Sequence, residues 1–352
     1  MSQPLSVTIV DKTPANTFVN HCFNLTGLAS HLTYQGIKVT QDIIRSQIPD
    51  SSHLFLLVHN FDKWPADFFR SYLDSIKTKA LVIPTQLADK KVMLETFNHP
   101  AISKVLIFSD FMVKYFTKTL EMHQDKVKSF NINFSLDIIP EYKLTKEKII
   151  LVPSLVEDIK NFEFILEAFE KIRRNNRFLY LVFFLQKSPE IDDTTFAEII
   201  NKFKDKLVAL NKWDWASHVR IITKSKNHYI DYLNAAYMVV LPTKKVNNIY
   251  SNLLLDAISA GKALVVPEDS FNIDTPLFKE GFTFDICKAG AGAIFYNSNS
   301  IESLIEATNI VFDNSNLRKI LEEQNLQLAH HHKGDVNNKK LANFIKRSIL
   351  ES

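Results

Sequence analysis

The feature that most constrains this fold is a series of short, almost wholly apolar runs separated by helix-patterned segments. Most runs are four or five residues long and lack polar alternation, which is typical of strands buried on both faces of a parallel sheet. The runs are, in chain order, Val7–Val10, Leu54–Val58, Ala80–Ile83, Lys104–Phe108, Ile149–Val152, Phe178–Leu185, Val219–Ile222, Met238–Leu241, Ala263–Val266 and Ala293–Tyr296.

The segments between the runs carry apolar residues at helical spacing. One stripe consists of Phe162, Ile165, Leu166, Phe169 and Ile172, and it predicts an amphipathic helix. The same pattern before Gly36 predicts a helix that this glycine ends. Similar patterns cover Thr194–Leu210 and Val336–Leu350. Strand alternating with helix, twice over, predicts an α/β fold of two Rossmann-like, doubly wound parallel-sheet domains.

A chain of 352 residues has the length of two ordinary domains. The halves separate in the charged, proline-containing stretch Pro140–Lys148. We therefore predict an N-terminal domain over residues 1–142, a C-terminal domain over 143–334, and a C-terminal helix over 335–352 that packs back on the N-terminal domain.

Composition excludes several classes of protein. The 42 basic and 39 acidic residues nearly balance, so charge does not indicate a nucleic-acid partner or a membrane surface. The stretch Met1–Thr8 lacks a signal-peptide pattern, and no apolar run approaches the roughly 20 residues of a transmembrane helix. Cys22 and Cys287 are the two cysteines and lie far apart, as in proteins of a reducing compartment. We expect a cytoplasmic protein.

Motifs for several chemistries are missing. None of the seven glycines lies between Gly36 and Gly261, and no strand is followed by the Gly-x-Gly-x-x-Gly turn of dinucleotide-dependent oxidoreductases. A Gly-x-Ser-x-Gly elbow of a hydrolase is also absent. No His, Glu or Cys cluster has metal-ligand spacing, and the run His330–His332 is interpreted as a solvated helix end. We predict neither a metal nor a cofactor.

Two strand-to-helix junctions in the second half carry the candidate chemistry. In open parallel sheets, ligands bind at the carboxyl ends of strands, beside helix N-termini that attract phosphate. At the first junction, the strand at Ile149 leads through Pro153 and Ser154 to Lys160, at the start of the next helix. A lysine there opposes the helix dipole, which makes sense if an anion lies between them. The alternative is a solvated lysine.

At the second junction, a strand ends at Pro242 and a polar loop containing Asn248 follows. A helix is predicted to begin near Ser251, a good N-cap residue, and to end at Gly261. Asp256 lies five residues into this helix, and a further buried strand follows immediately.

This segment, from Val239 to Pro267, resembles the signature segment of retaining glycosyltransferases of the B architecture. The resemblance extends to Val219–Pro242, to Val105–Phe116 and to the closing helices over Ser300–Leu328, so it covers most of the chain. Within the family, the chain looks closest to the small cytosolic group called glycosyltransferase 1 domain-containing proteins.

The resemblance implies two domains facing each other across a cleft, and metal-independent, retaining transfer from a nucleoside-diphosphate sugar. Lys160 matches the family's diphosphate-binding lysine, Asn248 its first glutamate, near the donor sugar, and Asp256 its second glutamate, which holds the ribose. Donor-binding positions are implied at Pro153, Ser154, Lys160, Asn248, Ile249, Tyr250, Ser251, Asn252, Leu253 and Asp256.

The departures from the family pattern support a second interpretation. Asn248 carries no charge, Ile249 and Ser251 replace loop glycines, and Ser154-Leu155 replaces a Gly-Arg pair that supplies one of two cations. Losing such a cation costs on the order of 100-fold in rate. The alternative to an enzyme is therefore a weakened or inactive homologue that binds a nucleotide sugar or serves as an accessory or scaffold protein. A protein partner or self-association stays open for either.

The acceptor is expected in the N-terminal domain. His59 directly follows a predicted strand and is the preferred catalytic candidate there, alongside Lys160 and Asn248 in the other domain. The alternative is a histidine satisfied by its own loop. Further acceptor-binding candidates, on the first helix or at strand ends, are Asn16, His21, Asn24 and Thr85.

Overall fold

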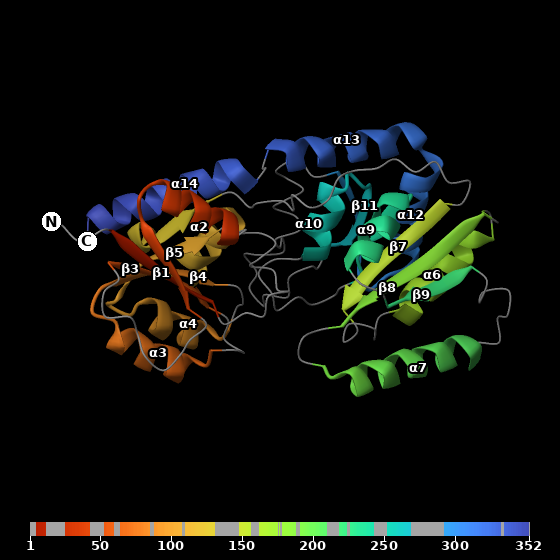
Figure 1. The fold of residues 1–352 in the computed structure, drawn as a ribbon. Helices are drawn as coiled ribbons and strands as arrows, with labels where there is room; N and C mark the ends of the chain where they lie inside the picture. The colour runs from red at the N-terminus through yellow and green to blue at the C-terminus, as the bar shows by residue number, and fades with distance from the viewer. Residues whose placement is uncertain are drawn as a thin grey trace. The chain divides into compact units, whose positions relative to one another are not determined.

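The computed structural model describes residues 5–11, 25–42, 53–59, 64–84, 88–107, 110–130, 148–155, 162–174, 176, 178–187, 191–209, 218–223, 226–242, 252–268, 292–331 and 334–351. The described elements divide into two compact units, each with its own sheet and helices (Figure 1). The predicted domain boundary, up to residue 147, lies outside the described residues.

Unit 1 is built on a six-stranded sheet in the order β2-β1-β3-β4-β5-β6. Every neighbouring pair is parallel. The chain starts in the middle of the sheet and proceeds outward in both directions, so the order reverses between β1 and β3. The strands are β1 (Ser6–Asp11), β2 (Lys38–Asp42), β3 (Leu54–His59), β4 (Lys79–Pro84), β5 (Ile102–Ile107) and β6 (Val127–Ser129).

The helices of unit 1 connect these strands, except for the last one. They are α2 (Leu25–Tyr34), α3 (Ala66–Ser75), α4 (Lys90–Phe97), α5 (Asp110–Lys114), which continues as one π-helical turn at Tyr115–Thr119, and α14 (Gly334–Leu350). Helix α14 packs against α2 (Figure 1). The Gln35 side chain donates a hydrogen bond to Asn343 Oδ1 at 2.8 Å, and the rings of Phe130 and Phe344 lie 5.3 Å apart.

Unit 2 has a second parallel sheet of six strands, in the order β12-β11-β10-β7-β8-β9. Counted from β7 as the first strand, this is the 3-2-1-4-5-6 order of a Rossmann fold, and the order reverses between β7 and β10. The strands are β7 (Lys148–Leu155), β8 (Leu179–Gln186), β9 (Val219–Ile222), β10 (Met238–Val240), β11 (Leu264–Pro267) and β12 (Ala293–Tyr296).

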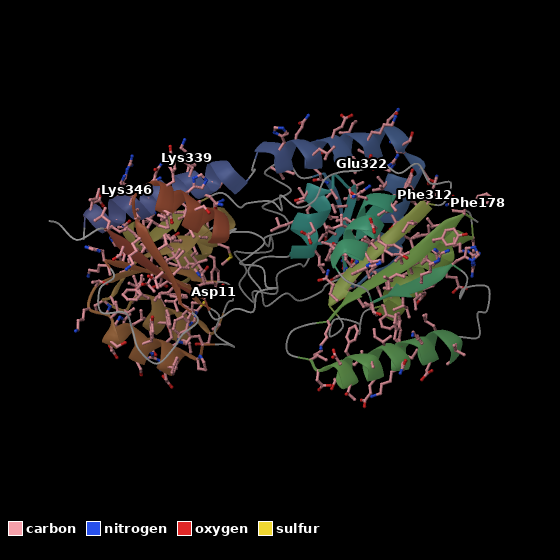
Figure 2. The ribbon with its side chains drawn as sticks, viewed as in Figure 1. Asp11, Phe178, Phe312, Glu322, Lys339 and Lys346 are labelled. Carbon is pink, nitrogen blue, oxygen red and sulfur yellow. The ribbon has the colours of Figure 1, made fainter. Side chains whose placement is uncertain are left out.

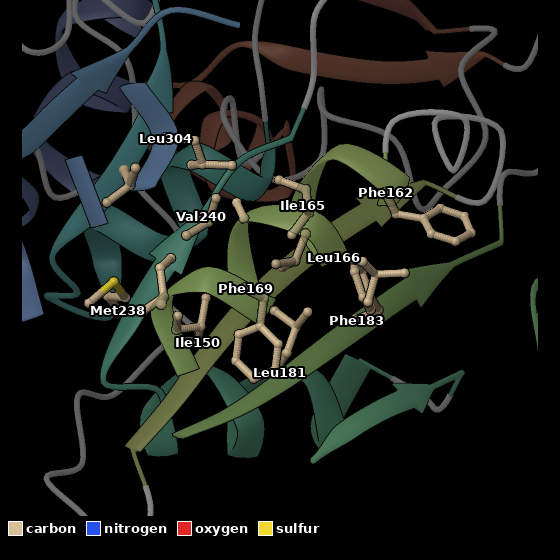
Figure 3. Packing of buried hydrophobic residues seen from close by; sticks show 14 of the residues in the cluster. Ile150, Phe162, Ile165, Leu166, Phe169, Leu181, Phe183, Met238, Val240 and Leu304 are labelled. Atoms are coloured by element: carbon tan, nitrogen blue, oxygen red, sulfur yellow. The ribbon is translucent and has the colours of Figure 1, made fainter. Parts of the chain in front are cut away.

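Helices of unit 2 cover this sheet and bury the stripes that the sequence predicts. The described helices are α6 (Phe162–Arg173), α7 (Asp193–Ala209), α9 (Lys226–Ala235), α10 (Asn252–Ser259), α12 (Ile301–Asp313) and α13 (Ser315–His331). Figure 3 shows α6 placing Ile165, Leu166 and Phe169 over the sheet, against Ile150 and Leu181. This continuous apolar core holds β7 and β10, the strands that flank the reversal, in fixed positions.

The prediction of two doubly wound parallel sheets is confirmed, with differences at the edges. The strand expected from Phe178 begins at Leu179, and Phe178 itself is a turn residue that is 77% exposed (Figure 2). The expected glycine helix ends occur at Gly36 and Gly261, where φ is +79° and +65°. Strands β2 and β6 were not predicted.

Candidate functional site

The candidate site of unit 2 lies at the carboxyl edge of its sheet, where the strand order reverses between β7 and β10. Strand β10 pairs with β7 at Ile150 and Leu151. The ladder between β7 and β8 instead continues to Leu155, opposite Gln186. Among the described residues, the last part of β7 therefore has no ladder partner on its β10 side. A reversal point of this kind is where open α/β sheets bind ligands.

Pro153 and Ser154 lie in this last part of β7. The sequence places them in a loop, but β7 continues through both residues to Leu155, so the predicted strand end at Val152 was wrong. Pro153 has no N–H group, which suits a strand margin where no ladder hydrogen bond is donated. Both side chains are buried. The two side chains therefore lie inside unit 2, and only a small part of each is exposed at the carboxyl edge of the sheet.

The backbone of Leu241, directly after β10, is held by two hydrogen bonds. Leu241 N–H donates to Val265 O at 3.0 Å, and the buried Tyr296 hydroxyl donates to Leu241 O at 2.8 Å. The N–H and C=O groups of Leu241 are thus held by residues of β11 and β12, just before Pro242. These contacts determine where the polar segment after residue 242, predicted to bind the donor, begins.

Asp256 lies on α10, the helix that follows β10. It is 6% exposed, whereas Leu253 on the same helix is partly exposed. A carboxylate so deep is costly unless polar groups compensate it. One polar neighbour is Tyr229 of α9, which is 0% exposed. Burial, with a smaller contribution from the Asp256 carboxylate, raises the pKa of the Tyr229 hydroxyl well above its usual value.

Lys262 and Asn325 form a buried polar cluster that the sequence did not indicate. It joins α9, α10 and α13 near the amino edge of the sheet. Lys262 Nζ donates to Asn234 O at 2.7 Å, which joins the ends of α10 and α9. The buried Asn325 of α13 donates to Lys262 O at 2.7 Å and to Gly292 O at 3.0 Å, and accepts from Gly292 N–H at 2.7 Å. Burial lowers the pKa of Lys262 to about 8, against the opposing field of Glu322.

In unit 1, His59 ends β3, at the carboxyl edge beside the reversal between β1 and β3, as expected. Its imidazole is 0% exposed and lies among the rings of Trp64, Phe69 and Phe97, with centroids 6.1, 4.1 and 5.9 Å away. Burial lowers the pKa of His59 to about 3, and a hydrogen bond with the Trp64 backbone opposes this shift only in part. This environment fits the alternative of a histidine held by its surroundings, and contact with an acceptor stays a prediction.

The other predicted site residues lie outside the part of the chain that the structure describes. For Asn252, the backbone is described as the first residue of α10 but the side chain is not. Those outside are Asn16, His21, Asn24, Thr85, Lys160, Asn248, Ile249, Tyr250 and Ser251. Among the described site residues, Pro153 and Ser154 lie in the last part of β7, and Leu253 and Asp256 lie on α10, the helix that follows β10.

The described residues include no group of three or more His, Cys, Asp or Glu side chains able to hold a metal ion. No described helix combines the length and apolar character needed to cross a membrane. A surface groove of about 790 Å³ runs along α12 to the start of α13, and its lining contains acidic, amide and isoleucine side chains but no predicted site residue.

The two parallel sheets and their reversal points define the class of fold. It is the architecture of the glycosyltransferases of the B class, which carry two Rossmann-like domains. No protein-family profile matches the sequence, and no curated protein sequence matches it either.

Solved structures do match. A glycosyltransferase from Rickettsia africae is 11% identical over 100% of both chains, with a TM-score of 0.70. Sucrose-phosphate synthase from Thermosynechococcus elongatus is 10% identical, with 99% of this chain and 100% of that one covered and a TM-score of 0.72. HepE from Anabaena, in complex with UDP-glucose, is 8% identical, with 98% and 100% covered and a TM-score of 0.72. At these identities the likeness concerns the fold alone.

Proposed function

We propose that this chain is a glycosyltransferase that transfers a sugar from a nucleoside-diphosphate sugar, with the donor at the carboxyl edge of unit 2. The observation that carries the proposal is the reversal between β7 and β10, with a buried carboxylate, Asp256, on the helix that follows. By the family resemblance, an acidic side chain on this helix hydrogen-bonds the hydroxyl groups of the donor ribose. The structure of HepE with UDP-glucose supports the choice of ligand.

The roles of the remaining groups follow from charge. Lys160 and the N-terminus of α10 would stabilise the negative charge that develops on the departing diphosphate. Asn248 would hydrogen-bond the donor sugar without adding charge. No side chain has to act as a nucleophile, because a diphosphate oxygen can receive the proton of the acceptor hydroxyl. Retention and independence from metal ions are proposed from the family resemblance.

The acceptor is proposed to bind in unit 1, near the candidates on the predicted first helix or at strand ends, which are Asn16, His21, Asn24, His59 and Thr85. A pKa of about 3 makes His59 a weak proton acceptor at neutral pH, so we assign it no proton-transfer step. A cytoplasmic location is proposed because the two cysteines lie far apart in the sequence, as in proteins of a reducing compartment.

The departures at Asn248 and at Ser154-Leu155 favour a second candidate, a homologue that binds the donor without turning it over. Replacing Asn248 by Glu separates the two. In a decayed enzyme the restored acid recovers donor hydrolysis or transfer. In an enzyme whose asparagine serves an altered donor, the same change lowers activity.

The proposal is tested first by binding. Thermal shift is measured with a panel of nucleoside diphosphates and their sugars on the wild type, Lys160→Ala and Asp256→Asn, with Lys202→Ala as the control. Lys202 is an exposed lysine of α7 in the same unit. At about a hundredfold the dissociation constant, a ligand stabilises by about 2.7 kcal/mol. One ligand that stabilises the wild type and the control but neither site variant supports the proposal, and no shift with any ligand refutes it.

A further inference from the structure

Tyr229 has a buried hydroxyl without a hydrogen-bond partner among the described residues. The residue lies in the first turn of α9, is 0% exposed, and packs its ring 5.0 Å from that of Phe184 on β8. Leaving such a group unpaired destabilises a folded protein, whereas phenylalanine would fill the same space without that cost. The contacts of the ligand-free protein therefore do not explain why this position carries a tyrosine and not a phenylalanine.

The position of Tyr229 relative to Asp256 suggests that reason. The hydrogen bond from Lys262 Nζ to Asn234 O ties the ends of α10 and α9 together. Counted from the helix starts, Tyr229 is the fourth residue of α9 and Asp256 is the fifth residue of α10. With a rise of about 1.5 Å per residue, each therefore lies roughly 5 Å into its helix. The Asp256 carboxylate also acts electrostatically on the Tyr229 hydroxyl, in the direction that raises its pKa.

We propose that Tyr229 is a positioning residue for the donor, whose hydroxyl donates a hydrogen bond to the Asp256 carboxylate when a ribose occupies the site. This inference rests on the proposed function. A carboxylate has two oxygen atoms, so one can accept from Tyr229 while the other accepts from the ribose hydroxyl groups. The bond from Tyr229 fixes the plane of the carboxylate, and hydrogen bonds to charged groups are the stronger kind.

The chain supplies a matched control in Ser259, one helical turn after Asp256. Its hydroxyl is also buried and has no partner among the described residues. Tyr229→Phe and Ser259→Ala therefore both remove an unpaired buried hydroxyl, but only the first removes the group assigned to Asp256.

The test compares ribose nucleotides with nucleotides that lack the ribose hydroxyl groups. UDP, GDP and ADP, each beside its 2′,3′-dideoxy counterpart, are titrated by calorimetry into the wild type, Tyr229→Phe, Ser259→Ala and Asp256→Asn. The pair whose ribose form binds the wild type most tightly is used throughout. Tyr229→Phe is expected to weaken binding of the ribose nucleotide about tenfold and that of the dideoxy form less than about twofold. Its melting temperature without ligand should equal or exceed that of the wild type, and Ser259→Ala should leave both affinities unchanged.

Three results would overturn the inference. Equal weakening of both nucleotides by Tyr229→Phe, with a lower melting temperature, would give the hydroxyl a structural role. Unchanged affinity in Tyr229→Phe, together with weakened binding in Asp256→Asn, would remove Tyr229 from the site and leave the proposed function intact. Absence of binding of every nucleoside diphosphate to the wild type would overturn both.

Discussion

Acidification should destabilise unit 1 through one residue, His59. The folded protein holds this imidazole with a pKa of about 3, whereas an unfolded chain has a histidine pKa near 6.5. Below pH 6.5 the unfolded state therefore binds a proton that the folded state refuses, so stability falls as the pH falls. Integrated from pH 7 to pH 5, the difference in proton binding removes about 2 kcal/mol of the free energy of unfolding.

The assay follows Trp64, whose ring lies 6.1 Å from His59 and is fully buried. In a Trp213→Phe, Trp215→Phe background, Trp64 is the single tryptophan, and its fluorescence reports the urea unfolding of unit 1. Following one unit avoids treating a two-domain chain as a single two-state system. His59→Phe should abolish about 2 kcal/mol of the acid-induced loss while leaving the denaturant slope unchanged.

The control is His123→Gln, which changes an exposed histidine of the same unit. It should show the full acid-induced loss of the wild type, and His59→Gln should behave as His59→Phe does. The reasoning is refuted if wild type and His59→Phe lose the same free energy between pH 7 and pH 5. In that case the folded protein accepts the proton, and the imidazole is not held neutral by burial.

Three further changes test unit 2. Asn325→Leu should destabilise it by about 3 kcal/mol or more in chemical denaturation, because buried backbone groups of Lys262 and Gly292 lose their partner. Gly261→Ala should cost about 1–3 kcal/mol more than Gly36→Ala in the same assay. Both glycines have positive φ, but a Cβ at Gly261 meets Leu326 at 2.5 Å and one at Gly36 meets nothing within 4 Å. Between pH 8 and 10.5 the wild type should gain stability, by about 3 kcal/mol at most, because the unfolded lysine keeps a proton that the folded Lys262 releases. Lys262→Met should remove this gain, which chemical denaturation across the pH range measures.

The sequence predicted the interior of both sheets and not all of their edges. Strands such as β3 and β4 are covered on both faces, so every residue of the run is apolar and the pattern is unmistakable. Strands β2 and β6 are the two edges of the sheet of unit 1. Their residues, Lys38–Asp42 and Val127–Ser129, are largely polar because an edge faces solvent, and neither alternation nor apolarity marks them.

At the candidate site, the sequence predicted the two strand-to-helix junctions, misplaced the ends of the strands by two or three residues, and missed the groups that hold them. The junctions after β7 and β10 were visible because a buried run passes directly into polar residues. Tyr229 and Tyr296 read as ordinary core residues, since the pattern does not say where a hydroxyl points. Lys262 reads as a surface lysine, and its backbone partner Asn325 lies 63 residues further along the chain, so only the fold brings them together.

Unit 1 is completed by the far end of the polypeptide. Gln35 and Asn343, which join α2 to α14, are separated by 308 residues. During synthesis, the sheet of unit 1 leaves the ribosome before unit 2, but α2 gains its contact with α14, which carries the buried Leu341 and Ile345, only after all of unit 2 has been made. The half translated first is therefore the half finished last, and a fragment that ends before α14 would carry an uncovered apolar surface into solution.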